Sequence, residues 1–352
     1  MRDTQKSPII STDLRRIAEQ ARNDPAKVFI SLAHRMDVVF LREAYRQVRK
    51  DAAPGLSGVT AKDYAGNLTA NLEGLHRRLK SKRYVAPKIK RVWIDKEGGK
   101  KRPIGLTEFE DKIVQKAVSM LLGAVYEQDF YDFSHGFREG HSAHQALKEL
   151  RDLCMNNNIQ WIIDADISGF FDNINHQKLR EILRMRVNDG GIMRLIGKWL
   201  NVGVVEGNVI SYNEKGTPQG GTISPLLANI YLHHVLDDWF IKEVKPRLKG
   251  KCFIIRFADD FIIGCEYEDD ARRVMEVLSK RFARFDLTIH PEKTKMIAFG
   301  KPTGTDDSKG EATFDFLGFT HYWAKSLKGY CVIKRKTARK KIRKAIVAMR
   351  EW

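Results

Sequence analysis

The sequence predicts an α+β protein that combines short strands with longer helices. Short apolar runs rich in β-branched and aromatic residues, each ended by turn residues, predict the strands. Stretches with apolar residues every three or four positions predict the helices. Two of the apolar runs meet acidic residues, at Asp164-Ala165-Asp166 and at Ala258-Asp259-Asp260. These acidic ends are the first candidates for a functional site.

The positive charge of the chain is large and clustered. The 352 residues are enough for two or three subdomains, and their net charge is +18. Twelve Lys or Arg stand between Arg77 and Arg102 against two acids, and eleven stand between Phe316 and Arg350 with no acid. A solvated basic surface is the alternative, but this clustering favours a channel for nucleic acid.

The cysteines and the apolar runs indicate where such a protein would work. Cys154, Cys252, Cys265 and Cys331 lack the paired spacing of a zinc site or a disulfide framework. No apolar run approaches the length of about 18 residues that spans a membrane, and the N-terminal segment lacks a signal peptide's apolar stretch. The sequence therefore predicts a soluble protein of the reducing cytoplasm without a membrane partner.

The N-terminal third predicts helices followed by a basic hairpin. Residues 12–50 read as helical, with one helix opening at Asp24-Pro25 because proline suits a first turn. Val92-Trp93-Ile94 predicts a strand, and a charged turn leads from it to Arg102. A basic hairpin suits phosphate, although an ordinary surface hairpin is the alternative. Helices are further predicted at residues 62–79, 109–126, 143–155, 172–185, 226–240, 269–285 and 334–349.

The first acidic strand leaves a choice between two carboxylates. Trp161-Ile162-Ile163 predicts a buried strand that leads into Asp164 and Asp166. Side chains two positions apart share one face of a strand, so spacing alone does not choose between them.

A glycine-rich loop at residues 216–225 precedes the helix predicted at 226–240. Ser224-Pro225 supplies a capping residue and a first-turn proline for that helix. Free backbone N–H groups among its glycines could let a nucleotide approach closely. A linker loop is the alternative, but the position between two acidic strands favours a functional loop.

Residues 251–265 predict a β-hairpin with buried arms and with Asp259 and Asp260 at its tip. Adjacent carboxylates repel each other unless a cation lies beside them. Mg²⁺ takes a few carboxylates together with phosphate oxygens. A solvated turn is the alternative, because aspartate also favours turns. Two more strands are predicted at residues 287–289 and 296–299.

Several motifs follow one another in a fixed order. They are Asp166-Ile-Ser-Gly-Phe-Phe, Thr217-Pro-Gln-Gly-Gly with Ser224-Pro225, Phe257-Ala-Asp-Asp, Pro291-Glu-Lys-Thr-Lys and Phe316-Leu-Gly-Phe. In this order they resemble the reverse transcriptases of bacterial group II introns, the intron-encoded maturases. Arg102-Pro-Ile-Gly and His135-Gly-Phe-Arg are similar to the family's fingers and upper-palm motifs.

The resemblance implies a right-hand polymerase, with an antiparallel palm sheet packed on helices. It implies an N-terminal helical extension at residues 1–50 and fingers with the upper palm at 51–160. The palm, with a fingers-like insertion, would occupy 161–325, and a basic helix at 326–352 would begin the thumb. The family's full thumb and maturase region would follow beyond the last residue.

The resemblance also assigns residues. Asp166, Asp259 and Asp260 would be the catalytic carboxylates, which leaves Asp164 a supporting role. With Ile167 they would hold two Mg²⁺ ions, which Mn²⁺ could replace.

Further positions of the resemblance concern the nucleotide. Lys101 and Arg102 would hold the triphosphate, and Phe171 would be the gate that excludes a ribose 2′-hydroxyl. The remaining nucleotide-binding positions are Gln219, Gly220 and Lys293, and for Lys293 a solvated turn is an equal alternative.

The implied function is RNA-directed DNA synthesis by two-metal nucleotidyl transfer. The partners would be an RNA template, a DNA or RNA primer, deoxynucleoside triphosphates and intron RNA, whose splicing the protein would assist. The alternatives are a non-catalytic RNA-binding maturase and a domesticated reverse transcriptase of phage defence or CRISPR adaptation. Phe257, where the family usually has tyrosine, and Ser168, Glu139 and His141 depart from the family pattern.

Overall fold

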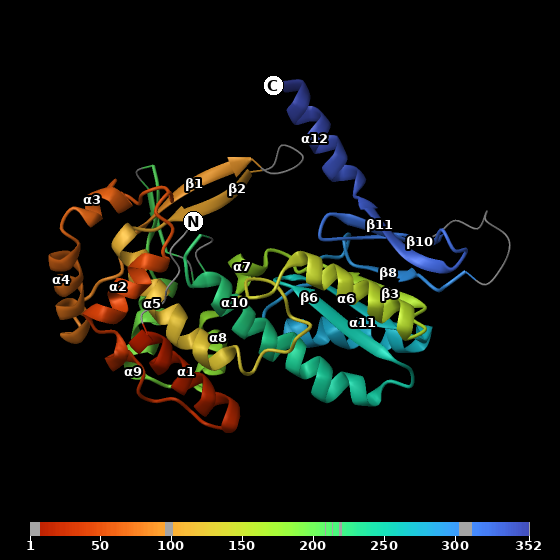
Figure 1. The fold of residues 1–352 in the computed structure, drawn as a ribbon, viewed down its shortest axis with the longest axis horizontal. Coiled ribbons are helices and arrows are strands. Elements are labelled where there is room, and N and C mark those ends of the chain that lie inside the picture. Colours follow the sequence, from red (N-terminus) through yellow and green to blue (C-terminus); the bar gives the residue numbers. More distant parts are fainter. Residues whose placement is uncertain are drawn as a thin grey trace. The chain divides into compact units, whose positions relative to one another are not determined.

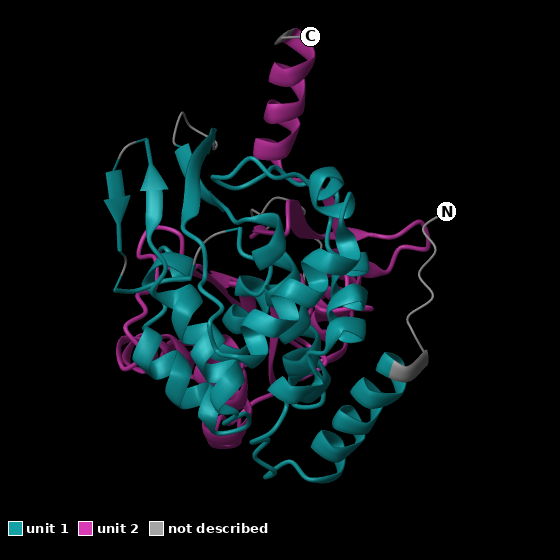
Figure 2. Cartoon of the chain, turned by 90° about the vertical axis from the view of Figure 1, so that its left-hand side faces the viewer, with its two compact units in different colours: residues 1–130, 169–231 teal, residues 131–168, 232–352 magenta. Residues whose placement is uncertain are grey.

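The computed structural model describes residues 8–95, 101–207, 209–212, 214–217, 220–302 and 312–351. Two compact units are each formed by separate stretches of the chain (Figure 2). Unit 1 comprises Met1–Phe130 and Gly169–Tyr231, and unit 2 comprises Tyr131–Ser168 and Leu232–Trp352. The division into extension, fingers, palm and thumb stays a prediction.

Unit 1 is built around α5 (Phe109–Tyr126), which is buried on most of its surface. α1 (Pro8–Asn23) and α2 (Val38–Gln47) both contact this helix (Figure 1). The other helices of the unit are α3 (Ala61–Ala65), α4 (Leu68–Lys80), α7 (Phe170–Asn173), α8 (His176–Arg184), α9 (Gly190–Leu200) and α10 (Ser224–Leu232).

A small mixed sheet completes unit 1, with the strand order β2-β1-β4-β5. β1 (Ile89–Asp95) and β2 (Lys101–Leu106) form an antiparallel hairpin, while β4 (Val204–Glu206) runs parallel to β1 and antiparallel to β5 (Val209–Ser211). Most side chains of the β1–β2 hairpin are exposed or half-buried, so its basic residues face solvent.

Unit 2 contains an antiparallel sheet with the order β6-β7-β3-β8. Its strands are β3 (Trp161–Ala165), β6 (Cys252–Phe257), β7 (Asp260–Cys265) and β8 (Lys295–Ala298). Ile262 belongs to the core beneath α6 (Ala143–Asn156), whereas its neighbour Phe261 contacts Phe282 of α11 (Glu268–Ala283). Successive side chains point to opposite faces of a strand, so α6 and α11 cover the two faces. Burial on both faces explains the continuous apolar runs.

A second antiparallel sheet of unit 2 has the order β11-β10-β9. β9 (Phe314–Phe316), β10 (Phe319–Lys325) and β11 (Cys331–Thr337) share a core with α6 and the first sheet. α12 (Arg339–Glu351) extends from the end of β11 away from these strands (Figure 1).

Several predicted elements are corrected by the structure. Residues 334–337 form the end of β11, because this strand pairs with β10 over seven residues, and the basic helix begins only at Arg339. No helix opens at Asp24-Pro25; Asp37 caps α2 instead by accepting a hydrogen bond from Phe40 N at 2.8 Å.

Three further segments differ from their predicted form. Only Ile289 of the predicted strand 287–289 pairs, in an isolated bridge with Ile167. The predicted helix 172–185 is divided into α7 and α8, and the helix after α10 continues in π-helical turns at His233–Asp238 and Phe240–Val244.

Candidate active site

The tip of the β6–β7 hairpin carries Asp259 and Asp260 on a tight turn. Phe257 pairs with Asp260, so Ala258 and Asp259 form a two-residue connection. Ala258 has a φ of +59°, a conformation in which glycine or asparagine is the easier choice. A non-glycine residue there costs about 1–3 kcal/mol and persists only where its surroundings impose it. The residues packed around this turn must therefore hold Ala258 in this conformation.

Arg256 fixes the turn from within the core and was not singled out in the sequence. Its side chain is fully buried and donates to both carboxylate oxygens of buried Asp237, at 2.8 and 2.6 Å. It also donates to the carbonyl oxygen of Ala258 at 2.9 Å. A charged residue inside the run Phe253–Phe257 was the signal, since a buried charge needs a partner.

The motif His135-Gly136-Phe137-Arg138 lies directly against the same turn. His135 N donates to the Arg256 carbonyl oxygen at 2.8 Å. A Cβ atom on Gly136 would lie 2.2 Å from Ala258 N, a distance that real side chains do not reach. Only glycine fits here, so the motif supports the hairpin tip by close backbone contact.

Asp166 follows β3 and is enclosed by the segment that leads into β8. The Lys293 ammonium group donates to Asp166 Oδ2, and His290 N donates to the Asp166 carbonyl oxygen at 2.8 Å. Ile167 is buried and bridges Ile289. Lys293 is thus an exposed turn residue that forms an ion pair with a candidate catalytic carboxylate.

Burial and neighbouring carboxylates raise the pKa values of two aspartates in unit 2. Crowding by surrounding protein, followed by the charges of Asp259 and Asp166, raises the pKa of Asp260 to about 6, although the side chain is accessible at the strand end. Burial, then the charges of Asp260 and Asp166, raises the pKa of Asp164 to about 7. Negative charge is thus concentrated around these carboxylates, and a bound cation would reduce the repulsion between them.

Hard divalent cations suit these oxygen ligands, but the side chains as placed do not form a finished cation site. Across the ranges that the structure describes, no three His, Cys, Asp or Glu side chains are grouped to hold a metal ion. The Lys293 ammonium group forms an ion pair with the Asp166 carboxylate. Binding a cation at Asp166 therefore requires this ion pair to open.

Apart from Lys293, which belongs to unit 2, the predicted nucleotide-binding residues belong to unit 1. Lys101 and Arg102 begin β2, and both are exposed. Gly220, with a φ of +108°, lies so close to this strand that a Cβ atom would be 2.5 Å from the Gly105 carbonyl oxygen. Thr217 N donates to the Phe171 carbonyl oxygen at 2.8 Å, so the glycine-rich loop contacts both β2 and the Phe171 segment. Gln219 lies outside the described residues.

A family model described as "Reverse transcriptase (RNA-dependent DNA polymerase)" matches residues 94–321. The chain belongs to the reverse transcriptase family. The match includes both acidic strands, the glycine-rich loop and the β6–β7 hairpin. The mixed α+β architecture with antiparallel sheets is consistent with the palm and fingers of this family.

Curated relatives narrow the membership to the group II intron type. The group II intron-encoded protein LtrA of Lactococcus lactis subsp. cremoris is 34% identical over 238 residues, which are 66% of this chain and 39% of that protein. Protein YkfC of Escherichia coli K12 is 34% identical over 243 residues, 67% of this chain and 63% of that protein. The chain thus matches only part of the length of each relative. The resemblance to group II intron reverse transcriptases is confirmed. No helix of the described chain is both long and apolar enough to cross a membrane.

Proposed function

We propose that the protein is an RNA-directed DNA polymerase of the group II intron type, which extends a primer on an RNA template with deoxynucleoside triphosphates. The single observation that carries this proposal is the strained, buried hairpin that presents Asp259 and Asp260 beside Asp166. Neighbouring carboxylates repel phosphate, so their presence favours synthesis over RNA binding alone.

The two units would contribute different groups to the proposed reaction. Asp166, Ile167, Asp259 and Asp260 would hold two Mg²⁺ ions. When bound, such ions activate the primer 3′-hydroxyl and stabilise the leaving pyrophosphate. Lys293 would leave Asp166 as the site fills and remain as a cation near the phosphates.

In unit 1, Lys101 and Arg102 would bind the triphosphate, since Arg binds phosphate bidentately. Phe171 would exclude a 2′-hydroxyl, while Gln219 and Gly220 would lie against the incoming nucleotide. The name of the lactococcal relative supports intron RNA as a partner, and assistance to splicing is part of the proposal.

Primer extension by the intact chain tests the proposed activity. A labelled DNA primer annealed to an RNA template should lengthen when deoxynucleotides and Mg²⁺ are supplied, and chelation of the metal should stop it. The same preparation is assayed for binding of the template-primer. Tight binding without extension under either Mg²⁺ or Mn²⁺ would replace the polymerase with the RNA-binding maturase, the second candidate function.

A domesticated role in phage defence or CRISPR adaptation would use the same chemistry. The name of the lactococcal relative, an intron-encoded protein, favours the intron role. Splicing of the intron RNA with and without added protein distinguishes the two, because a domesticated enzyme would extend primers yet leave the splicing rate unchanged.

A further inference from the structure

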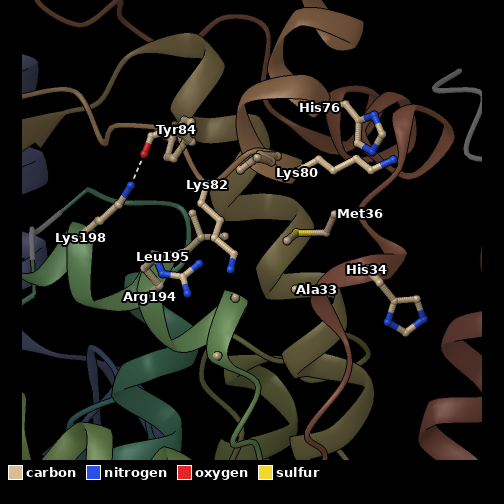
Figure 3. A pocket seen from close by; sticks show the side chains of 13 residues that line it. Ala33, His34, Met36, His76, Lys80, Lys82, Tyr84, Arg194, Leu195 and Lys198 are labelled. Atoms are coloured by element: carbon tan, nitrogen blue, oxygen red, sulfur yellow. Dashed lines mark hydrogen bonds between the residues drawn. The ribbon is translucent and has the colours of Figure 1, made fainter.

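Unit 1 contains a cavity of about 640 Å³ whose wall carries six basic side chains. The cavity lies between the C-terminal end of α4, the turn at Ala33–Arg35 and the first half of α9 (Figure 3). No Asp or Glu is among the described residues that line it. The basic residues are His34, His76, Lys80, Lys82, Arg194 and Lys198.

Two of these cations, Lys82 and Arg194, line the same cavity, and no acidic residue is among its described lining residues. Figure 3 shows the side chains of Lys82, from the segment after α4, and Arg194, from α9, reaching toward the same space. Both residues are exposed, and neither has an ion pair within the described ranges. Lys198, by contrast, donates to the carbonyl oxygen of Tyr84. Like charges that line one cavity repel each other unless a counter-ion binds there.

Stabilisation of helix ends does not explain this arrangement. Lys80 is the last residue of α4 and Lys82 lies two residues beyond it, where cations are favourable. Arg194, however, is the fifth residue of α9 and lies outside its last turn, and the N-terminal end of that helix is positive. Asp189, the acid at that end, already accepts backbone N–H groups from Leu32, Ala33, Gly191 and Ile192 at 2.6–3.0 Å. Its carboxylate oxygens therefore already bind backbone N–H groups.

The backbone at Lys82 is also unusual. Its φ is +63°, and the residue follows the end of α4, where glycine or asparagine takes this left-handed conformation most easily. A lysine there costs about 1 kcal/mol or more. The conformation directs the chain so that Lys82 lines the cavity.

The cavity combines this charge with apolar surface and with a basic neighbour. Met36, Leu195 and Tyr84 are buried wall residues that could lie against a sugar or a base. A second hollow shares Lys80 with the cavity and adds three arginines. Its lining residues are Gly74, Arg77, Arg78, Lys80, Ser81 and Arg83. Contiguous basic hollows suit a row of phosphates better than a single anion.

We propose that this cavity, the α4–α9 pocket, binds a nucleoside phosphate of an RNA strand whose next phosphates cross the second hollow. Lys82 and Arg194 would hold one phosphate between them, with Arg194 supplying two parallel N–H groups. The choice of RNA rests on the proposed function, whereas the phosphate chemistry follows from the pocket. None of the three candidate catalytic aspartates belongs to unit 1.

Binding of a labelled single-stranded RNA of about 20 nucleotides, without deoxynucleotides or divalent ions, tests the pocket. The variant carries Lys82→Gln and Arg194→Gln. The matched control carries Arg16→Gln and Arg184→Gln, which remove the same charge from exposed positions of α1 and α8. We expect the pocket variant to raise Kd about tenfold and to lower the slope of log Kd against log salt by about 0.7, since the two side chains share one phosphate and each single-strand phosphate contact contributes about 0.7.

The control should change Kd less than about twofold. Equal losses in the two variants would overturn the pocket, because net charge alone would then explain binding. Arg194→Lys, which keeps the charge but not the planar fork, should give an intermediate loss. Circular dichroism melts verify that each variant is folded.

Competition with free nucleoside triphosphate and with inorganic phosphate identifies the source of the phosphate. Resistance of the RNA complex to millimolar nucleotide supports a strand as the occupant. Displacement of the RNA by nucleotide from the wild type but not from the pocket variant would mean that the pocket binds phosphate. Its occupant would then be a free nucleotide instead of an RNA strand. Primer extension by the wild type decides the proposed function separately, so the two proposals can fail independently.

Discussion

Two β-hairpins of the molecule, β6–β7 and β1–β2, carry opposite charges in opposite settings. The arms of β6–β7 are almost wholly buried, and the hairpin presents two carboxylates at a strained turn. The residues of the β1–β2 hairpin are almost all exposed or half-buried, and they include Lys101 and Arg102. Carboxylates that share metal ions must be held in fixed positions, which takes a rigid core. Cations that gather phosphate work through longer, hydrated side chains and tolerate an exposed strand.

The comparison predicts that removing a buried cation near β6–β7 damages the fold far more than removing an exposed one from β1–β2. Arg256→Met would leave the carboxylate of Asp237 buried without its partner, and we expect a loss of about 3–5 kcal/mol in the free energy of unfolding. Arg91→Met is the matched control, since Arg91 pairs with Glu206 at 3.5 Å in a partly exposed position. That pair should contribute less than about 1 kcal/mol.

Urea unfolding of both variants measures the difference. Adding Asp237→Leu to Arg256→Met should restore much of the loss, because apolar replacements of a buried pair are often neutral. Similar losses for Arg256→Met and Arg91→Met would remove the basis of the comparison.

Acid should weaken unit 2 through a buried histidine. His321 of β10 is fully buried, and neither ring nitrogen has a hydrogen-bond partner among the described residues. Burial, followed by the charge of Arg335, lowers the pKa of His321 from 6.5 to about 4. The neutral form is thus favoured by folding. Its stability contribution is complete above pH 6.5 and falls between pH 6.5 and 4, by at most about 3 kcal/mol.

His321→Phe tests this pH dependence. The ring already stacks on Phe314, with centroids 4.9 Å apart, so phenylalanine should retain that contact. The free energy of unfolding should decline less between pH 6.5 and 4 in the variant than in the wild type. Parallel declines would exclude His321 as the cause.

Contact between Gly136 and the β6–β7 turn predicts a sensitive position. Gly136→Ala forces a methyl group against Ala258 N, so we expect a loss of about 1–3 kcal/mol and a larger fractional loss of primer extension. Gly123→Ala is the control, because nothing lies within 4 Å of its added Cβ in α5. There alanine should stabilise the helix by about 0.5–1 kcal/mol. Retention of full activity by Gly136→Ala would show that the turn tolerates displacement.

The smallest expected effect concerns selectivity in unit 1 rather than stability. If Phe171 excludes the 2′-hydroxyl, Phe171→Ala should raise ribonucleotide incorporation about tenfold relative to deoxynucleotide incorporation, since pocket sterics discriminate by such factors. Tyr212→Ala, which shortens an exposed aromatic side chain of the same unit, should leave the ratio unchanged. Single-nucleotide extension with each sugar gives the ratio, and an unaltered ratio for Phe171→Ala would reject the gate.

Local sequence patterns predicted the β6–β7 hairpin well, because its arms are continuous apolar runs and its tip is polar. They did not predict the Arg256–Asp237 pair, since the partners are 19 residues apart on a strand and a helical segment. The basic run at residues 334–337 was read as helix, but pairing with β10 decides its conformation. The α4–α9 pocket was equally hidden, because its walls come from three distant segments that only tertiary packing brings together.

In the proposed function, carboxylates of unit 2 carry out synthesis while basic residues bind the RNA. Asp259→Asn tests it most directly when primer extension and template-primer binding are measured on one preparation. We predict that extension falls about a thousandfold, as expected from losing several kcal/mol of metal-assisted stabilisation, while Kd for template-primer changes little. Extension at the wild-type rate, or loss of binding in parallel with synthesis, would contradict the account.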